Sequence, residues 1–229
     1  MRPNKPRWDM VKNVGDADLG MQMLEGFHLY PLMVDLRFHR WDEIIQTPEP
    51  REERTLLRAF WQFARAMALA GQGKPDEAAA EQTQFEARRT TMPAEVRYLL
   101  NNKASDVLAL AAATLDAQLA GARGDKEQSI QEWRRAVERE STLQYDEPPP
   151  WFYPVRESLA AALLRNGQAK EAEAVFRAAI DKHPRDGRLL FGLWQTLTAQ
   201  KHDNEAALVE QQFNAAWTNA TVKLRMEDL

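Results

Sequence analysis

Histidine side chains and closely spaced carboxylates are the groups in this sequence that could do acid–base or metal chemistry, because cysteine is absent. His28 and His39 are 11 residues apart, about three turns of an α-helix, so one helix face could present both to a metal ion. Pro31 lies between them, and no acidic residue is placed as a third ligand. His183 precedes a proline, and His202 lies in an expected turn. We therefore expect no metal site, and a metal enzyme built on His28 and His39 is the hypothesis to be excluded.

Acidic residues stand close together at several places in the chain. Three such pairs are Asp76 and Glu77, Asp146 and Glu147, and Glu171 and Glu173. General acid–base catalysis needs one carboxylate of a pair to be desolvated, with a raised pKa. The first and third pairs instead fall in the expected first turns of helices, where negative charge favours the helix dipole. The middle pair is expected to cap the next element or to bind a basic neighbour. Phosphate-binding glycine loops and the HExxH zinc motif are also absent from the sequence. No catalytic residue and no cofactor is predicted, and the chain is not expected to be an enzyme.

The charge balance and the lengths of the apolar runs narrow the possible classes of partner and the location of the chain. The 229 residues carry 30 basic and 34 acidic side chains, so a basic groove for nucleic acid is not expected. No apolar run reaches the roughly 18 residues of a membrane span, and the beginning of the sequence lacks the apolar core of a signal peptide. A cytoplasmic location is favoured. A periplasmic location would require the chain to be a fragment whose targeting segment lies upstream.

The elements that would position any functional side chain are helical, and the clearest of them lie between residues 154 and 184. Val155, Leu159 and Leu163 recur at helical spacing in a first segment, and a second amphipathic segment ends at Pro184. Gly167 separates the two segments and can end the first helix, because glycine adopts a left-handed backbone at low cost. The pattern predicts a helical hairpin.

This stretch resembles a tetratricopeptide (TPR) repeat, a helical hairpin of about 34 residues with small residues at the helix contact, glycine at the turn and a closing proline. The residues that carry the resemblance are Ala160, Gly167, Ala172, Phe176, Ala179 and Pro184. Most of the chain also looks like the C-terminal half of a group of bacterial TPR proteins, from which no activity can be transferred. The resemblance implies an all-α fold, a right-handed α-solenoid of about five TPR-like helical hairpins.

The hairpins can be placed along the chain by their turns. Turn residues align at His39, Gly73, Gly124, Gly167 and Lys201, with spacings of 34, 51, 43 and 34 residues. An arm at 1–15, expected to be poorly ordered, precedes one predicted domain at 16–229. Its hairpins are expected at about 16–48, 52–92, 104–143, 154–184 and 187–218. The closing residues 221–229 are expected to form a strand-like or irregular cap.

The two longer spacings indicate insertions between hairpins. Residues 90–103 are expected to contain an extra helical turn at about 96–100. Residues 145–153 contain three consecutive prolines and several aromatic residues, and the prolines impose an extended path. This second insertion is interpreted either as a rigid spacer whose aromatics fill a gap between hairpins or as an aromatic platform for a ligand.

The resemblance further implies that one side chain set on the first helix of each hairpin lines a concave groove. The predicted groove residues are Met33, Arg37, Phe60, Phe63, Met67, Gln118, Arg165, Arg188, Phe191 and Gln195. The groove is expected to be apolar towards its N-terminal half, which suits an amphipathic helix, and to carry arginines for a carboxylate towards its C-terminal half. The Lys and Asn clamp of chaperone-binding TPR domains is not reproduced at these positions.

The sequence therefore predicts a non-enzymatic TPR-type scaffold that binds a protein or peptide segment in its concave groove. A structural module that self-associates, as a homo-oligomer, is the alternative from a different class, and small-ligand binding at the groove is another. No nucleic-acid partner and no membrane insertion are expected. The identity of the partner is not contained in these patterns.

Overall fold

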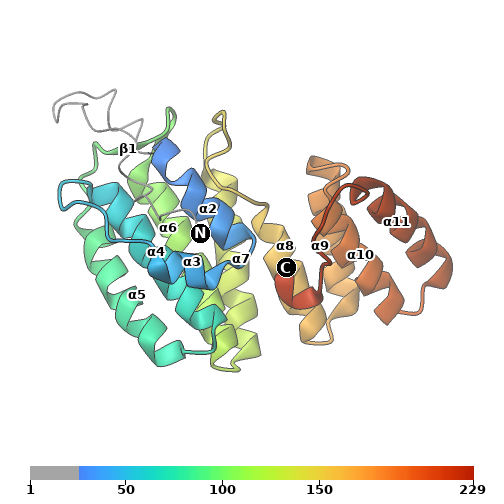
Figure 1. Ribbon diagram of the computed structural model, residues 1–229. Coiled ribbons are helices and arrows are strands. Elements are labelled where there is room, and N and C mark those ends of the chain that lie inside the picture. Colours follow the sequence, from blue (N-terminus) through green and yellow to red (C-terminus); the bar gives the residue numbers. More distant parts are fainter. Residues whose placement is uncertain (1–25) are drawn as a thin grey trace. The chain divides into compact units, whose positions relative to one another are not determined.

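A computed structural model describes residues 26–229 of the chain, and the predicted arm at 1–15 lies outside the described residues, as does the first part of the first hairpin (Figure 1). The described part is built almost entirely of α-helices, which confirms the predicted all-α fold class. The helices are α2 (Tyr30–Arg37), α3 (Trp41–Gln46), α4 (Thr55–Gly71), α5 (Pro75–Thr90), α6 (Ala104–Ala122), α7 (Lys126–Thr142), α8 (Val155–Arg165), α9 (Ala169–Lys182), α10 (Gly187–Ala199) and α11 (Asp203–Ala216). None of the helices within 26–229 combines the length and the apolar composition that a membrane crossing requires.

The chain groups into two compact units. Among the described residues, unit 1 comprises 26–125 and 138–152, and unit 2 comprises 126–137 and 153–229. The helix α7 contributes its first part to unit 2 and its last part to unit 1. The single continuous domain expected at 16–229 stays a prediction.

Left-handed backbone marks every turn that the sequence aligns. Gly73, Gly124 and Gly167 have φ values of 74°, 83° and 77°, and His39 and Lys201 have φ values of 51° and 60°. Each of these residues lies between the two helices of a pair, from α2 and α3 to α10 and α11. Glycine adopts this conformation freely, whereas the side chains of His39 and Lys201 make it costly.

In unit 2, α10 packs against α8, α9 and α11. The Asp186 carboxylate begins α10 by accepting hydrogen bonds from the backbone N–H groups of Arg188 (2.9 Å) and Leu189 (3.3 Å). Phe176 of α9 is fully buried against α10, and Gly192 of α10 leaves the space that its ring occupies. The contact between α9 and α10 is therefore fixed by one large and one minimal residue.

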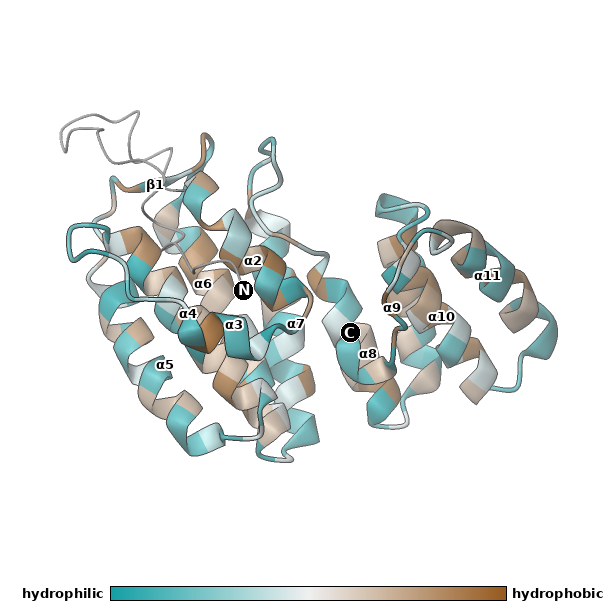
Figure 2. Ribbon diagram, viewed as in Figure 1, coloured by the Kyte–Doolittle hydropathy of each residue, from teal (hydrophilic) through white to brown (hydrophobic). Residues whose placement is uncertain are grey.

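In unit 1, α4 packs against α3, α5 and α6. The helix α4 is apolar over most of its surface, and α5 presents hydrophilic residues on the face seen in Figure 2. This pattern matches the amphipathic stripe by which the sequence predicts helices that are buried on one side.

The helical turn expected at 96–100 is wrong. The chain instead forms a two-stranded antiparallel ribbon of β1 (Arg97–Tyr98) and β2 (Asn102–Lys103), in which Tyr98 pairs with Asn102. Leu99 between the strands has a φ of 54°, which an α-helix cannot contain. The Asp146 carboxylate holds the ribbon by accepting hydrogen bonds from the side-chain amides of Asn101 (3.0 Å) and Asn102 (2.8 Å). Contacts made more than 40 residues away thus decide the local structure.

Candidate functional site

The ten predicted groove residues divide into three classes of exposure. Five are buried, with exposed fractions between 0% and 7%: Met33, Phe60, Phe63, Arg188 and Phe191. Arg37, Met67, Gln118 and Gln195 are half-buried, and Arg165 is exposed. Half of the predicted set therefore has little side-chain surface available to a partner.

The apolar residues of α4 belong to the core of unit 1 because the two insertions cover them. The ring of Tyr98, from the first insertion, lies 5.6 Å from the ring of Phe60. The ring of Trp151, from the proline-rich insertion, lies 6.0 Å from the ring of Phe63. Trp151 is itself only 5% exposed, so this aromatic fills a space between elements, as the rigid-spacer interpretation expects. The apolar groove wall predicted on α4 is an internal contact in this unit.

Arg165 and Arg188 are the two predicted groove residues that the structure brings onto the same target. Arg165, at the end of α8, donates from Nη1 to the backbone carbonyl of Met226 at 2.9 Å. Arg188, in the first turn of α10, donates from Nη2 to the backbone carbonyl of Asp228. Both carbonyls belong to residues 222–229, which we call the closing segment. The sequence places carboxylate recognition at these arginines, whereas in the structure they bind main chain.

The closing segment also buries apolar side chains in unit 2. Leu224 and Leu229 are 6% and 7% exposed, and Met226 packs against the same core cluster. This cluster includes residues from α8, such as Ala160 and Ala161, and a row from α10, such as Leu190. The segment runs beside α8, where the C label stands in Figure 1, and ends in a short 3₁₀ turn at Met226–Asp228. It is an irregular cap, and the sequence pattern alone does not reveal that it docks.

The closing segment therefore covers part of the face formed by α8 and α10, the first helices of their two pairs. We call this surface the α8/α10 face.

Residues 155–196, which contain α8, α9 and most of α10, match the family model of the tetratricopeptide repeat. This segment is a TPR repeat. No curated protein matches the chain. With its all-helical described part, the chain has a TPR-like helical repeat fold.

Two statements about function follow from the TPR repeat at a coarse level. Repeats of this family mediate protein–protein interactions in general, and the family is generally non-enzymatic. The α8/α10 face consists of the first helix of the TPR repeat and the helix that follows the repeat's second helix. The face that carries the closing segment is thus formed by α8, which lies within the matched residues, and by α10, most of which does.

A buried ion pair forms the floor of the α8/α10 face in the TPR repeat. The Glu157 side chain on α8 is fully buried, and its Oε1 accepts a hydrogen bond from Nε of Arg188 at 2.9 Å. An unpaired carboxylate in this place would be costly, so the pair fixes the direction of the Arg188 guanidinium. Nη2 of the same guanidinium donates a hydrogen bond to the backbone carbonyl of Asp228. Only the structure shows that Glu157 orients an arginine.

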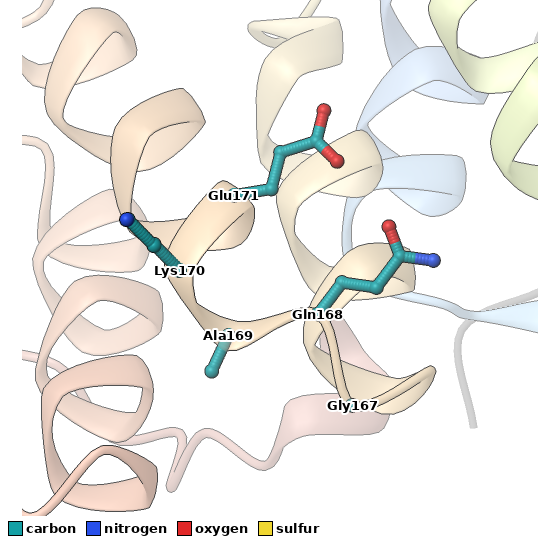
Figure 3. A pocket seen from close by; sticks show the side chains of 5 residues that line it. All are labelled: Gly167, Gln168, Ala169, Lys170 and Glu171. Atoms are coloured by element: carbon teal, nitrogen blue, oxygen red, sulfur yellow. The ribbon is translucent and has the colours of Figure 1, made fainter.

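A surface hollow of about 560 Å³ lies at the beginning of α9 in the TPR repeat. It is lined by Gly167, Gln168, Ala169, Lys170 and Glu171. Figure 3 shows the Lys170 side chain pointing away from those of Gln168 and Glu171. Glu171 forms an ion pair with Arg134 at 2.6 Å.

The residues considered for metal or acid–base chemistry do not assemble. Among residues 26–229 no group of three or more histidine and acidic side chains is arranged to hold a metal ion. The imidazole of His39 stacks on the Trp41 indole, with 4.6 Å between ring centroids. Asp146, expected to cap an element or to bind a basic neighbour, instead accepts its hydrogen bonds from the amides of Asn101 and Asn102. These side chains have structural partners.

Proposed function

We propose that this chain is a non-enzymatic scaffold that binds a segment of a protein partner on the α8/α10 face. The observation that supports this proposal is the closing segment itself. Its main-chain carbonyls accept hydrogen bonds from Arg165 and Arg188, and its Leu224 and Leu229 side chains enter the core cluster. A surface with these properties has the donors and the apolar sites that binding an extended peptide requires.

In this proposal the arginine donors bind the main chain of the partner segment, and the apolar sites select its side chains. Arginine donors that bind carbonyl oxygens accept any sequence, because every residue carries a carbonyl. Apolar sites discriminate, because they require side chains of suitable size at a fixed spacing. Gln195 lies seven residues after Arg188 on α10, two helical turns along the same side, and extends the surface on which a longer partner segment would lie.

Photo-crosslinking tests the proposal. A benzoylphenylalanine placed at Gln195 is expected to form an adduct with a specific partner in cells that contain the chain. Leu208 on α11 is 59% exposed and provides the control position. An equal yield of the same adduct at Gln195 and Leu208, or no adduct at Gln195, would contradict binding on this face.

A variant of the exposed arginine tests the same face in purified protein. Arg165→Glu replaces a donor to a carbonyl by a carboxylate, so the purified partner is expected to bind at least tenfold more weakly. Arg177, an exposed arginine of α9 that pairs with Glu173 at 2.8 Å, supplies the matched control Arg177→Glu. Loss of binding in the control alone would move the site away from the α8/α10 face.

A further inference from the structure

The closing segment is held as a bound peptide would be, by a small number of contacts on a surface formed by other elements. Between Trp217 and Leu224 the chain is exposed and has no regular secondary structure. Nε1 of Trp217 donates to the carbonyl of Val222 at 2.7 Å, and the Val222 side chain remains 49% exposed. Beyond this hydrogen bond, the buried side chains of the segment begin at Leu224.

The anchors form a simple pattern along the closing segment. Leu224, Met226 and Leu229 supply apolar side chains at the first, third and sixth positions of residues 224–229. Between them, the carbonyls of Met226 and Asp228 accept hydrogen bonds from the two arginines. The face therefore recognises three apolar side chains and two carbonyl groups.

We propose that the closing segment is an exchangeable occupant of the α8/α10 face, and that the partner presents a segment of the same chemistry. That segment carries apolar residues at its first, third and sixth positions. This inference rests on the proposed function and adds the class of ligand and its regulation. Because the closing segment is part of the same chain, it competes at a high effective concentration.

The competition has a quantitative consequence. A partner binds only the fraction of molecules whose closing segment is displaced, so its apparent affinity is reduced by that fraction. Segments with few buried contacts open at a much lower free energy than packed helices. The closing segment has three apolar anchors, whereas α10 is buried along most of its length. The segment is thus expected to open while the helices of unit 2 remain folded.

A labelled peptide with the sequence of residues 218–229 tests the exchange in the full-length chain. The variant Leu224→Asp with Leu229→Asp is expected to release the closing segment and to bind this peptide at least tenfold more tightly than the wild type does. Val222→Asp is the matched control, because the Val222 side chain is exposed. It is expected to bind the peptide as weakly as the wild type. A peptide with aspartate in place of both leucines is expected not to bind.

Three results of these measurements would overturn the inference. The first is a double variant that keeps its helical circular dichroism and yet binds the peptide no better than the wild type. The second is peptide binding that is unchanged by Arg165→Glu in the double-variant background. The third is a wild-type dimer that the free peptide dissociates, because the occupant would then be a second copy of the chain.

Hydrogen exchange of the wild-type chain provides a test that does not depend on whether the double variant folds. The backbone N–H of Asp228 donates to the Arg225 carbonyl at 3.0 Å. This amide is expected to exchange at least a hundredfold faster than the buried amides in the middle of α10. Equal exchange rates would show that the segment opens only when unit 2 unfolds, and would overturn the inference.

The outcome can be separated from that of the proposed function. If crosslinking of the partner at Gln195 is unchanged by saturating concentrations of the 218–229 peptide, the exchange of the closing segment is wrong, while partner binding on the face stands. If the peptide binds the double variant but no partner crosslinks at Gln195, the exchange stands and partner binding on the face is wrong.

Discussion

Substitution of Gly192 by alanine is expected to destabilise unit 2, although alanine is the better helix former. A Cβ atom at this position would lie 2.2 Å from Cζ and 2.3 Å from Cε1 of Phe176. Carbon atoms need about 3.5 Å between them, so the two groups must separate by roughly 1 Å. Phe176 is fully buried and cannot turn its ring into solvent. The helices α9 and α10 must therefore shift.

The magnitude follows from two opposing contributions. Overpacking in a well-packed core costs about 1–3 kcal/mol. Exchanging glycine for alanine inside a helix stabilises it by about 1 kcal/mol. The expected net result for Gly192→Ala is a loss of up to about 2 kcal/mol in the free energy of unfolding. Urea unfolding followed by circular dichroism measures this loss, and an unchanged m value would show that the same surface unfolds.

A double-mutant cycle identifies the cause of the loss. In a Phe176→Leu background the smaller side chain leaves room for the new methyl group, so Gly192→Ala is expected to become neutral or stabilising. Gly167→Ala is the matched control. Its Cβ would meet no atom within 4 Å, but its φ of 77° makes alanine strained. The cost of Gly167→Ala should not depend on residue 176. If Gly192→Ala destabilises both backgrounds equally, or stabilises the wild type, the packing argument is refuted.

Three further predictions concern stability. Lys201→Gly is expected to raise the free energy of unfolding by about 1 kcal/mol, because Lys201 has a φ of 60°; an unchanged urea midpoint would count against this. Glu157→Ala is expected to cost about 3–5 kcal/mol, because it leaves the buried Arg188 without its carboxylate; a loss below 1 kcal/mol in urea unfolding would disprove it. Burial, and secondarily the charge of Arg54, lowers the pKa of His28 below its unfolded value. Protonation of His28 therefore favours the unfolded chain. The free energy of unfolding falls as the pH drops below about 6.5, the pKa of an unperturbed histidine. Between pH 7.5 and 5.5 the Tm of the wild type should fall further than that of His28→Gln, and parallel curves would refute this.

The hairpin architecture could be predicted because its signals are local. The turn positions are spaced along the chain by the length of a helix pair, with an insertion added in two of the four spacings, and two of the turns could be aligned although they carry His39 and Lys201 in place of glycine. Both residues adopt the left-handed backbone that the alignment requires. The small and large residues Ala172 and Phe176 are both fully buried, as their spacing on one helix face indicates.

The exposure of the predicted groove could not be read from the same pattern. An apolar stripe on a helix shows that something covers it, but the covering element can be a partner or another part of the chain. Trp151 covers Phe63 from a segment more than 80 residues further along the chain. Hydrophobic periodicity contains no information on such a contact. The ribbon at 97–103 was missed for the same reason, because distant Asp146 holds it.

Hydrophobic periodicity could not predict the docking of the closing segment either, since its three apolar anchors within six residues have the spacing of neither a helix nor a strand. The two arginines were located by helical spacing, yet their hydrogen-bond partners differ from the expected carboxylate. An arginine has five N–H donors in a fixed plane, so one buried arginine can serve two acceptors. Arg188 uses Nε for Glu157 and Nη2 for the Asp228 carbonyl. Because Glu157 holds the guanidinium whether or not Asp228 is present, the donor stays oriented when the segment leaves. An incoming peptide would then meet a preorganised site and would not bear the entropic cost of ordering this side chain.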